Sequence, residues 1–203
     1  MGGRLHNQWT AHETTIVGVD ISNDGNLIVT ASDDSTAKIW TSMSRETDMF
    51  RSTGMAKLLH NFKHEDFILH VAFSPDSRLL VTSSPNGAVY VWDVTSASMT
   101  AKLNGHLSSV SSIAFTPSGS HILSCSWDKT MRLWELDPTV RKTAKGHFGG
   151  SCIKIIEGHA VRLTAPIAGK FTDNHVGVHL ICHDNSRCLV DHFWRGGSER
   201  AND

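Results

Sequence analysis

The sequence of 203 residues lacks a long apolar run, an excess of charge of either sign and a dense set of cysteines. No stretch approaches the roughly 18 apolar residues of a membrane-spanning helix, and no secretory pattern opens the chain. Lys and Arg total 19 against 20 Asp and Glu, so the net charge of −1 gives no long-range attraction to nucleic acid or to an anionic membrane. We therefore expect an intracellular protein, cytoplasmic or nuclear, without direct nucleic-acid binding and without membrane attachment.

The cysteines also bear on metal chemistry. The four of them do not form a disulfide framework of the secreted kind. Two, Cys182 and Cys188, lie in a histidine-rich segment after His175 and His179. His and Cys are zinc ligands, but the paired Cys-x2-Cys spacing that makes a zinc site specific is missing. We expect no metal and no other cofactor, and a hydrolase or metal-dependent enzyme built on this segment stays as the alternative.

A repeat is the main positive signal. Three segments aligned on a histidine share a turn signal ten residues on, Thr or Ser at eighteen, Asp or Asn at twenty-two and Trp at twenty-eight. Short apolar runs bounded by turns lie between these landmarks, which predicts short antiparallel strands rather than helices. The landmark sets are His12, Thr30, Asp34 and Trp40; His64, Thr82, Asn86 and Trp92; and His106, Ser124, Asp128 and Trp134.

These landmarks resemble the WD-repeat family, whose units carry a Gly-His and a Trp-Asp dipeptide and form the blades of a β-propeller. Gly105-His106 and Trp92-Asp93 match the two dipeptides. The resemblance covers residues 11–135 and implies an all-β, partial propeller of three to four four-stranded antiparallel blades. It also implies that the His, Ser/Thr, Asp and Trp of each repeat form a hydrogen-bonded set inside the blade.

The repeat spacing sets the expected boundaries. We expect blades at 11–40, 58–93 and 98–135, the last two including their preceding strands, with an insertion at 41–57 and an exposed linker at 136–151. Residues 1–10 are either a ring-closing strand or a disordered terminus, and residues 152–203 are either a degenerate fourth blade or a divergent tail. Because propellers usually close with about four to eight blades, the sequence suggests a fragment, a truncated product, or half of an assembly that self-associates to complete the ring.

The Ser, His and Asp of a set also spell a hydrolase triad. A nucleophile is used once, at an exposed site, whereas this constellation occurs three times and carries Asn86 in place of the acid in the second copy. Repetition favours a structural network, so we expect no catalytic residue and a weaker network in the second repeat.

The expected function is a protein-interaction scaffold or regulatory subunit that binds a protein or peptide on the loop face of the propeller. The other alternative is a truncated, non-functional propeller. The resemblance implies that partner contacts lie in the loop after each histidine and just before each turn Asp. Several residues at these positions of this sequence are acidic, which favours a basic or Arg-bearing partner. Carried over to this sequence, the contact residues are Asp33, Glu65, Asp66, Phe67, Pro85, Leu107 and Trp127.

Overall fold

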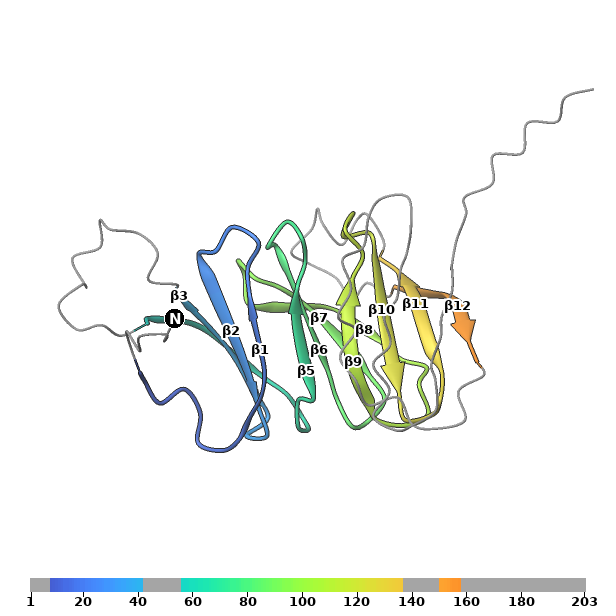
Figure 1. The fold of residues 1–203 in the computed structure, drawn as a ribbon, viewed down its shortest axis with the longest axis horizontal. Coiled ribbons are helices and arrows are strands. Elements are labelled where there is room, and N and C mark those ends of the chain that lie inside the picture. The colour runs from blue at the N-terminus through green and yellow to red at the C-terminus, as the bar shows by residue number, and fades with distance from the viewer. Residues whose placement is uncertain (1–7, 42–55, 137–149, 158–203) are drawn as a thin grey trace, which may run out of the picture.

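The computed structural model describes residues 8–41, 56–136 and 150–157. Within these ranges the chain forms β-strands and no helix, and the strands build three four-stranded antiparallel sheets that stand side by side (Figure 1). Their first strands, β1, β5 and β9, lie next to one another at the inner side of the row. The prediction of an all-β fold made of propeller blades is confirmed.

Each sheet orders its strands as they follow in the chain. The first sheet contains β1 (Ile16–Ile21), β2 (Leu27–Ser32), β3 (Thr36–Thr41) and β4 (Leu58–Lys63). The second contains β5 (His70–Phe73), β6 (Leu79–Ser83), β7 (Val89–Asp93) and β8 (Ser98–Leu103). The third contains β9 (Val110–Phe115), β10 (His121–Ser126), β11 (Met131–Glu135) and β12 (Ser151–Ile156).

The sheets are offset by one strand from the boundaries expected from the sequence. The expected boundaries group residues 58–63 and 98–103 with the blade that follows, and assign residues 152–203 to a degenerate fourth blade or a divergent tail. In the structure β4 pairs with β3, β8 with β7, and β12 with β11, so each strand completes the preceding sheet. The physical reason is that the third strand of a sheet has a free hydrogen-bonding edge, which the next extended segment covers before the histidine loop leads inward.

Other boundaries fall mostly on residues that are not described. These are the insertion at 41–57, the linker at 136–151, the two alternatives for residues 1–10, and the choice between a degenerate blade and a divergent tail beyond β12.

Apolar cores fill the spaces between the sheets. One cluster joins Val29 and Ile39 of the first sheet to Val71 and Leu80 of the second. A second cluster joins the far face of the second sheet to Ile113, Phe115, Ile122 and Trp134 of the third. Each interior blade face is therefore stabilised by burial against its neighbour, as in other face-to-face sheet packing.

Candidate functional site

The landmark residues of the third repeat are joined by hydrogen bonds. Trp134 Nε1 donates to Ser124 Oγ over 2.8 Å, and Ser124 Oγ lies 2.7 Å from His106 Nε2. Because an indole N–H can only donate, Ser124 accepts from Trp134 and gives its own proton to His106 Nε2. His106 then carries its ring proton on Nδ1, which lies 2.8 Å from Asp128 Oδ2 and donates to it.

Asp128 also organises the backbone around it. The Leu107 amide donates to Oδ2 over 3.0 Å and the Thr130 amide to Oδ1 over 2.9 Å. Burial tends to raise the pKa of Asp128, but these amides, the Thr130 hydroxyl and His106 together hold that pKa below its usual value. The carboxylate thus ties the loop after the histidine to the turn between β10 and β11.

The first repeat has the same arrangement. His12 Nδ1 lies 2.9 Å from Asp34 Oδ2, His12 Nε2 lies 2.7 Å from Thr30 Oγ1, and Thr30 Oγ1 also accepts from Trp40 Nε1 over 2.9 Å. Burial raises the pKa of Asp34, yet hydrogen bonds from Thr36, His12 and the backbone outweigh it and lower the pKa to about 2. Asp34 is therefore ionised throughout the physiological range.

The second repeat differs at its acid position. Trp92 Nε1 donates to Thr82 Oγ1 over 2.9 Å, and Thr82 Oγ1 lies 3.2 Å from His64 Nε2. Asn86, however, donates from Nδ2 to Tyr90 Oη over 3.0 Å, and the structure does not bring it to His64. His64 Nδ1 is buried without a hydrogen-bond partner among the described residues, and burial lowers the pKa of His64 to about 4.

One further residue of the hydrogen-bonded set, a threonine, was not predicted from the sequence repeat. Thr36 and Thr130 lie twenty-four residues after their histidines, and each hydroxyl bonds both the ring nitrogen Nδ1 and the carboxylate of its set. Ala88 occupies this position in the second repeat. A threonine recurring at that offset, and missing only where the acid is missing, was the signal that could have identified it.

The triad-like geometry does not create an accessible nucleophile. Ser124 stands between His106 and Trp134 with none of its surface exposed, so a substrate carbonyl cannot reach its hydroxyl in this structure. The adjacent Cys125 thiol is also buried, and burial raises its pKa to about 12, which keeps it protonated.

The seven residues carried over from the family lie at the ends of the sheets where the histidine loops and the second turns meet, at the lower edge of the view in Figure 1. Backbone hydrogen bonds join neighbouring repeats there, from the His64 amide to Ser35 and from the Val110 amide to Ser84. We call this surface the loop face. Its exposed apolar side chains are Leu107, Phe67 and Trp127, which are 90, 53 and 38% exposed.

The loop face also carries acidic residues, which belong to the first two repeats. Glu13 and Glu65 are exposed, and Asp33 and Asp66 are half-buried. Pro85 is half-buried in the turn between β6 and β7, where its carbonyl accepts from the Ser109 hydroxyl of the next repeat. The loop face therefore combines large apolar side chains with carboxylates, as a surface that receives a basic segment would.

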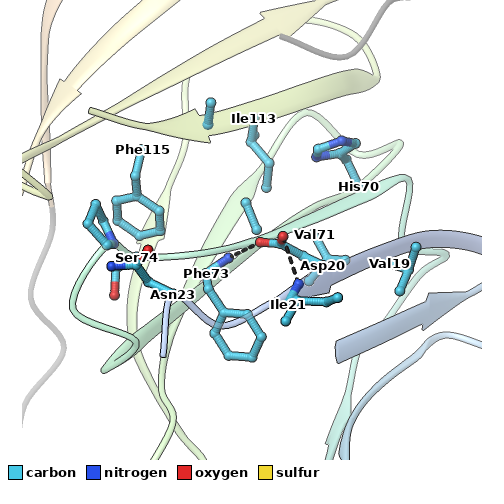
Figure 2. Close-up of a pocket in the computed structure, with 13 residues that line it drawn as sticks. Val19, Asp20, Ile21, Asn23, His70, Val71, Phe73, Ser74, Ile113 and Phe115 are labelled. Atoms are coloured by element: carbon cyan, nitrogen blue, oxygen red, sulfur yellow. Dashed lines mark hydrogen bonds between the residues drawn. The ribbon is translucent and has the colours of Figure 1, made fainter. Parts of the chain in front are cut away.

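A groove of about 430 Å³ runs along β1, β5 and β9. Figure 2 shows the residues that line it. Asp20 on β1 accepts there from the Phe73 amide on β5 over 2.8 Å, so a side chain links the inner strands of two sheets (Figure 2). His70 borders the groove, and burial lowers its pKa although the nearby Asp20 opposes this. Apolar side chains such as Val19, Val71 and Ile113 line much of the rest.

The described part of the chain contains no group of three or more His, Cys, Asp or Glu placed to hold a metal ion, and no helix long and apolar enough to cross a membrane. His175, His179, Cys182 and Cys188, which carry the enzyme alternative, lie outside the described residues.

Comparison with known proteins identifies the repeats. The family described as "WD domain, G-beta repeat" matches residues 3–41, 56–93 and 97–135, which is more than half of the chain. Protein HIRA of Dictyostelium discoideum is 27% identical over 150 residues, covering 64% of this chain and 13% of that protein. The chromatin assembly factor 1 subunit FAS2 homolog of Oryza sativa subsp. japonica is 31% identical over 133 residues, covering 66% of this chain and 26% of that protein.

A solved structure shares the fold. The structure of U3-55K superposes with a TM-score of 0.62 at 20% identity and covers 77% of this chain and 43% of that chain. The chain thus spans less than half the length of each of these three proteins.

Proposed function

Because the chain belongs to the WD40-repeat family, we propose that it is an interaction scaffold or regulatory subunit that binds a protein or peptide partner on its loop face. Relatives built from the same repeats include a chromatin assembly factor subunit, a component of an assembly, which supports a role of this class. The observation that carries the proposal is the exposure of Leu107, Phe67 and Trp127 on a face that also carries carboxylates.

We propose that the partner presents a basic, extended segment. Four carboxylates, those of Glu13, Asp33, Glu65 and Asp66, belong to the loops of the first two repeats on this face. Complementary charge would steer a basic peptide to them and fix its register. Phe67 and Trp127 would supply the apolar contacts, since aromatic side chains dominate interface energetics. A partner of this kind binds more weakly as the salt concentration rises.

The test is a fluorescence-anisotropy titration with labelled peptides of equal length, one rich in Arg and Lys and one with Glu in their place. We expect the basic peptide alone to bind. Trp127→Ala should weaken that binding at least tenfold, and the charge reversals Glu65→Lys and Asp66→Lys should weaken it and flatten its salt dependence.

Two substitutions away from the loop face serve as controls. Glu135→Lys reverses an exposed charge at the opposite end of the third sheet, and Met99→Ala removes an exposed apolar side chain from the outer strand β8. Both should leave peptide binding unchanged. Equal binding of the acidic and basic peptides, or equal losses in the control variants, would refute the loop-face proposal.

We propose no catalytic role for the hydrogen-bonded sets, which instead fix the loops to the sheets. Ser124 is fully buried and already accepts from Trp134, which supports a structural role. We further propose an intracellular location, in the cytoplasm or nucleus. The name of the chromatin assembly factor relative supports it, and fluorescence microscopy of a tagged chain tests it. The expectation of no direct nucleic-acid binding stays a prediction.

A further inference from the structure

The buried histidine of the second repeat lacks a hydrogen-bond acceptor that its counterparts have. Thr82 Oγ1 accepts from Trp92 Nε1, so its own proton goes to His64 Nε2 and the ring proton of the histidine stays on Nδ1. That Nδ1 is buried without a hydrogen-bond partner among the described residues. In the other two repeats the histidine Nδ1 lies 2.9 Å from Asp34 Oδ2 and 2.8 Å from Asp128 Oδ2. The second repeat is therefore one acceptor oxygen short.

Asn86 occupies the position of those aspartates and carries an amide group where the oxygen is needed. Its Oδ1 accepts from the Ala88 amide over 3.0 Å, as the aspartates of the other repeats accept from the amide two residues on. Its Nδ2 is a donor, as His64 Nδ1 is, so the two atoms cannot bond to each other, and Nδ2 donates to Tyr90 Oη instead. Replacing this NH₂ group with an oxygen would turn Asn86 into the aspartate that the other repeats use.

The residue that follows Asn86 provides the means for this replacement. In the chemistry of asparagine, the backbone nitrogen of the next residue attacks the side-chain carbonyl carbon Cγ, and a glycine has no Cβ to obstruct the approach. The next residue here is Gly87. The turn itself requires that glycine, because its φ is 83° and a Cβ there would lie 2.5 Å from the His106 carbonyl oxygen. The fold therefore keeps a reactive Asn-Gly pair at the position where an aspartate is missing.

The contacts of the turn also favour the reaction. The Ala88 amide that donates to Oδ1 polarises the Asn86 side-chain carbonyl and stabilises the negative charge that develops on Oδ1 when Cγ is attacked. Asn86 is exposed, so water reaches Cγ and ammonia can leave. The attacking amide, that of Gly87, donates to the Ser84 carbonyl over 3.3 Å, whereas the Gly119 amide makes the same kind of turn bond over 2.8 Å. The longer bond is the weaker one, and it releases the attacking nitrogen more readily.

We propose that Asn86 is a site of spontaneous deamidation and that its aspartate product completes the hydrogen-bonded set of the second repeat. The Gly87 nitrogen gives up its proton and bonds to Cγ, the bond from Cγ to Nδ2 breaks, and Nδ2 leaves with a proton as ammonia. This step leaves a cyclic imide. Water then adds to one of the two imide carbonyls. Cleavage of the bond from the Gly87 nitrogen to Cγ gives aspartate, and cleavage of its bond to the main-chain carbonyl carbon gives isoaspartate.

The two products differ in their effect on the second sheet. Aspartate leaves the backbone unchanged and offers an oxygen to His64 Nδ1. A carboxylate facing the ring favours its protonated form, so the pKa of His64 should rise from about 4 toward its ordinary value. Isoaspartate adds one atom to the backbone of the turn between β6 and β7, which are paired along their whole length, and should therefore weaken that pairing.

Peptide mapping by mass spectrometry, after incubation of the folded full chain at mildly alkaline pH, tests the reaction. We expect the peptide that contains Asn86 to gain the mass that replacement of NH₂ by OH adds. Asn86→Gln is the matched control: it keeps the amide, but its extra methylene makes ring closure slow, so it should not convert. A chain unfolded in urea shows that the conditions suffice, because both Asn-Gly pairs, at Asn86 and at Asn104, should convert there. If Asn86 converts in urea but stays intact in the folded chain, the turn protects it and the proposal is wrong.

Nuclear magnetic resonance tests whether the product completes the set. Asn86→Asp supplies the aspartate product directly, and the His64 signals are assigned by their absence in His64→Gln. The His64 ring in Asn86→Asp should titrate at a pH higher by about one or more than in the fresh chain, and the incubated chain should develop the same signals. An unchanged titration in Asn86→Asp, or conversion to isoaspartate alone, would overturn the proposal. It does not rest on the loop-face function, because both measurements are made without a partner.

Discussion

The second repeat holds its buried histidine with different groups from those of the first and third repeats. In the first and third, a carboxylate accepts from the histidine ring, from a threonine hydroxyl and from backbone amides of two segments. In the second, Asn86 turns to Tyr90, and His64 instead packs its ring against Tyr90 and Trp92, with centroids 4.9 Å away in both cases. Aromatic packing there replaces an ionic hydrogen-bonded network.

The second repeat also contains buried polar groups that are unsatisfied. His64 Nδ1, Ser83 Oγ and Ser84 Oγ are buried without partners among the described residues, and all three belong to the second repeat. A buried polar group without a partner costs about 1–3 kcal/mol. The second sheet is flanked on both sides by another sheet, so its apolar burial offsets this cost. A blade with two covered faces tolerates a poorer polar network than one with a single covered face.

The largest expected effect comes from removing the acid where it is used. Asp128→Ala should lower the free energy of unfolding by about 3 kcal/mol, because His106 Nδ1–H and the Leu107 and Thr130 amides lose their acceptor. Asn86→Ala, at the equivalent position of the second repeat, should cost less than about 1 kcal/mol, because Asn86 is exposed. Urea unfolding followed by tryptophan fluorescence measures both, and similar losses at the two positions would contradict the comparison.

Acidification should destabilise the fold mainly through buried histidine. Burial lowers the pKa of His64 from 6.5 to about 4, so the unfolded chain binds more protons than the folded chain between these values. Stability is therefore complete above about pH 6.5 and falls, by about 2–3 kcal/mol, as the pH drops toward 4. The contribution of Asp34, whose pKa is lowered to about 2, is lost only at lower pH, as the pH falls from about 4 toward 2.

The measurement is the free energy of unfolding at a series of pH values for the unsubstituted chain and for His64→Gln. The variant should show a shallower decline between pH 6.5 and 4, whatever its absolute stability. An unchanged slope would assign the acid sensitivity to other groups, such as His70 and His106, whose pKa values burial also lowers.

The second repeat can be converted toward the other two. Asn86→Asp with Ala88→Thr supplies the carboxylate and the hydroxyl that the first and third repeats use. The double variant should gain about 1 kcal/mol of stability, because His64 Nδ1–H acquires an acceptor. The pKa of His64, followed by nuclear magnetic resonance, should rise toward its ordinary value. Ala88→Thr alone is the control and should give neither change.

Much of the fold was predictable because the repeat signal is local. Turn residues and short apolar runs at fixed offsets specify antiparallel strands and identify the family. Burial was not predictable in this way. Val19 and Val71 are the same residue type at the same repeat position, yet they are 66 and 2% exposed, because among the described residues Val71 faces a neighbouring sheet and Val19 does not. The sheets that β4 and β8 join also depend on which strand edges are free. The spacing of the repeats does not specify those edges.

The candidate site shows the same division. Residue identity indicated that Asn86 would weaken the second set, but the contact that Asn86 makes with Tyr90 depends on a side chain whose counterparts in the other repeats are Lys38 and Arg132. The threonines at positions 36 and 130 lay in the sequence at a constant offset and were overlooked because hydroxyl residues are common. Contacts between repeats, which build the loop face, require the three-dimensional arrangement.

The smallest expected effect concerns the turn that follows the acid position. The residue there adopts a positive φ in every repeat: 63° at Ser35, 83° at Gly87 and 70° at Lys129. A residue with a side chain costs about 1–2 kcal/mol when its φ is positive, and replacing it with glycine removes this cost. Glycine also raises the entropy of the unfolded chain, which offsets about 0.4–1 kcal/mol of that stabilisation. Lys129→Gly should therefore stabilise the chain by about 0.5 kcal/mol in urea unfolding. Gly87→Ala should destabilise it, because the new Cβ would lie 2.5 Å from the His106 carbonyl oxygen. If both substitutions changed the free energy of unfolding in the same direction, backbone strain in the turn would not be what distinguishes the second repeat at this position.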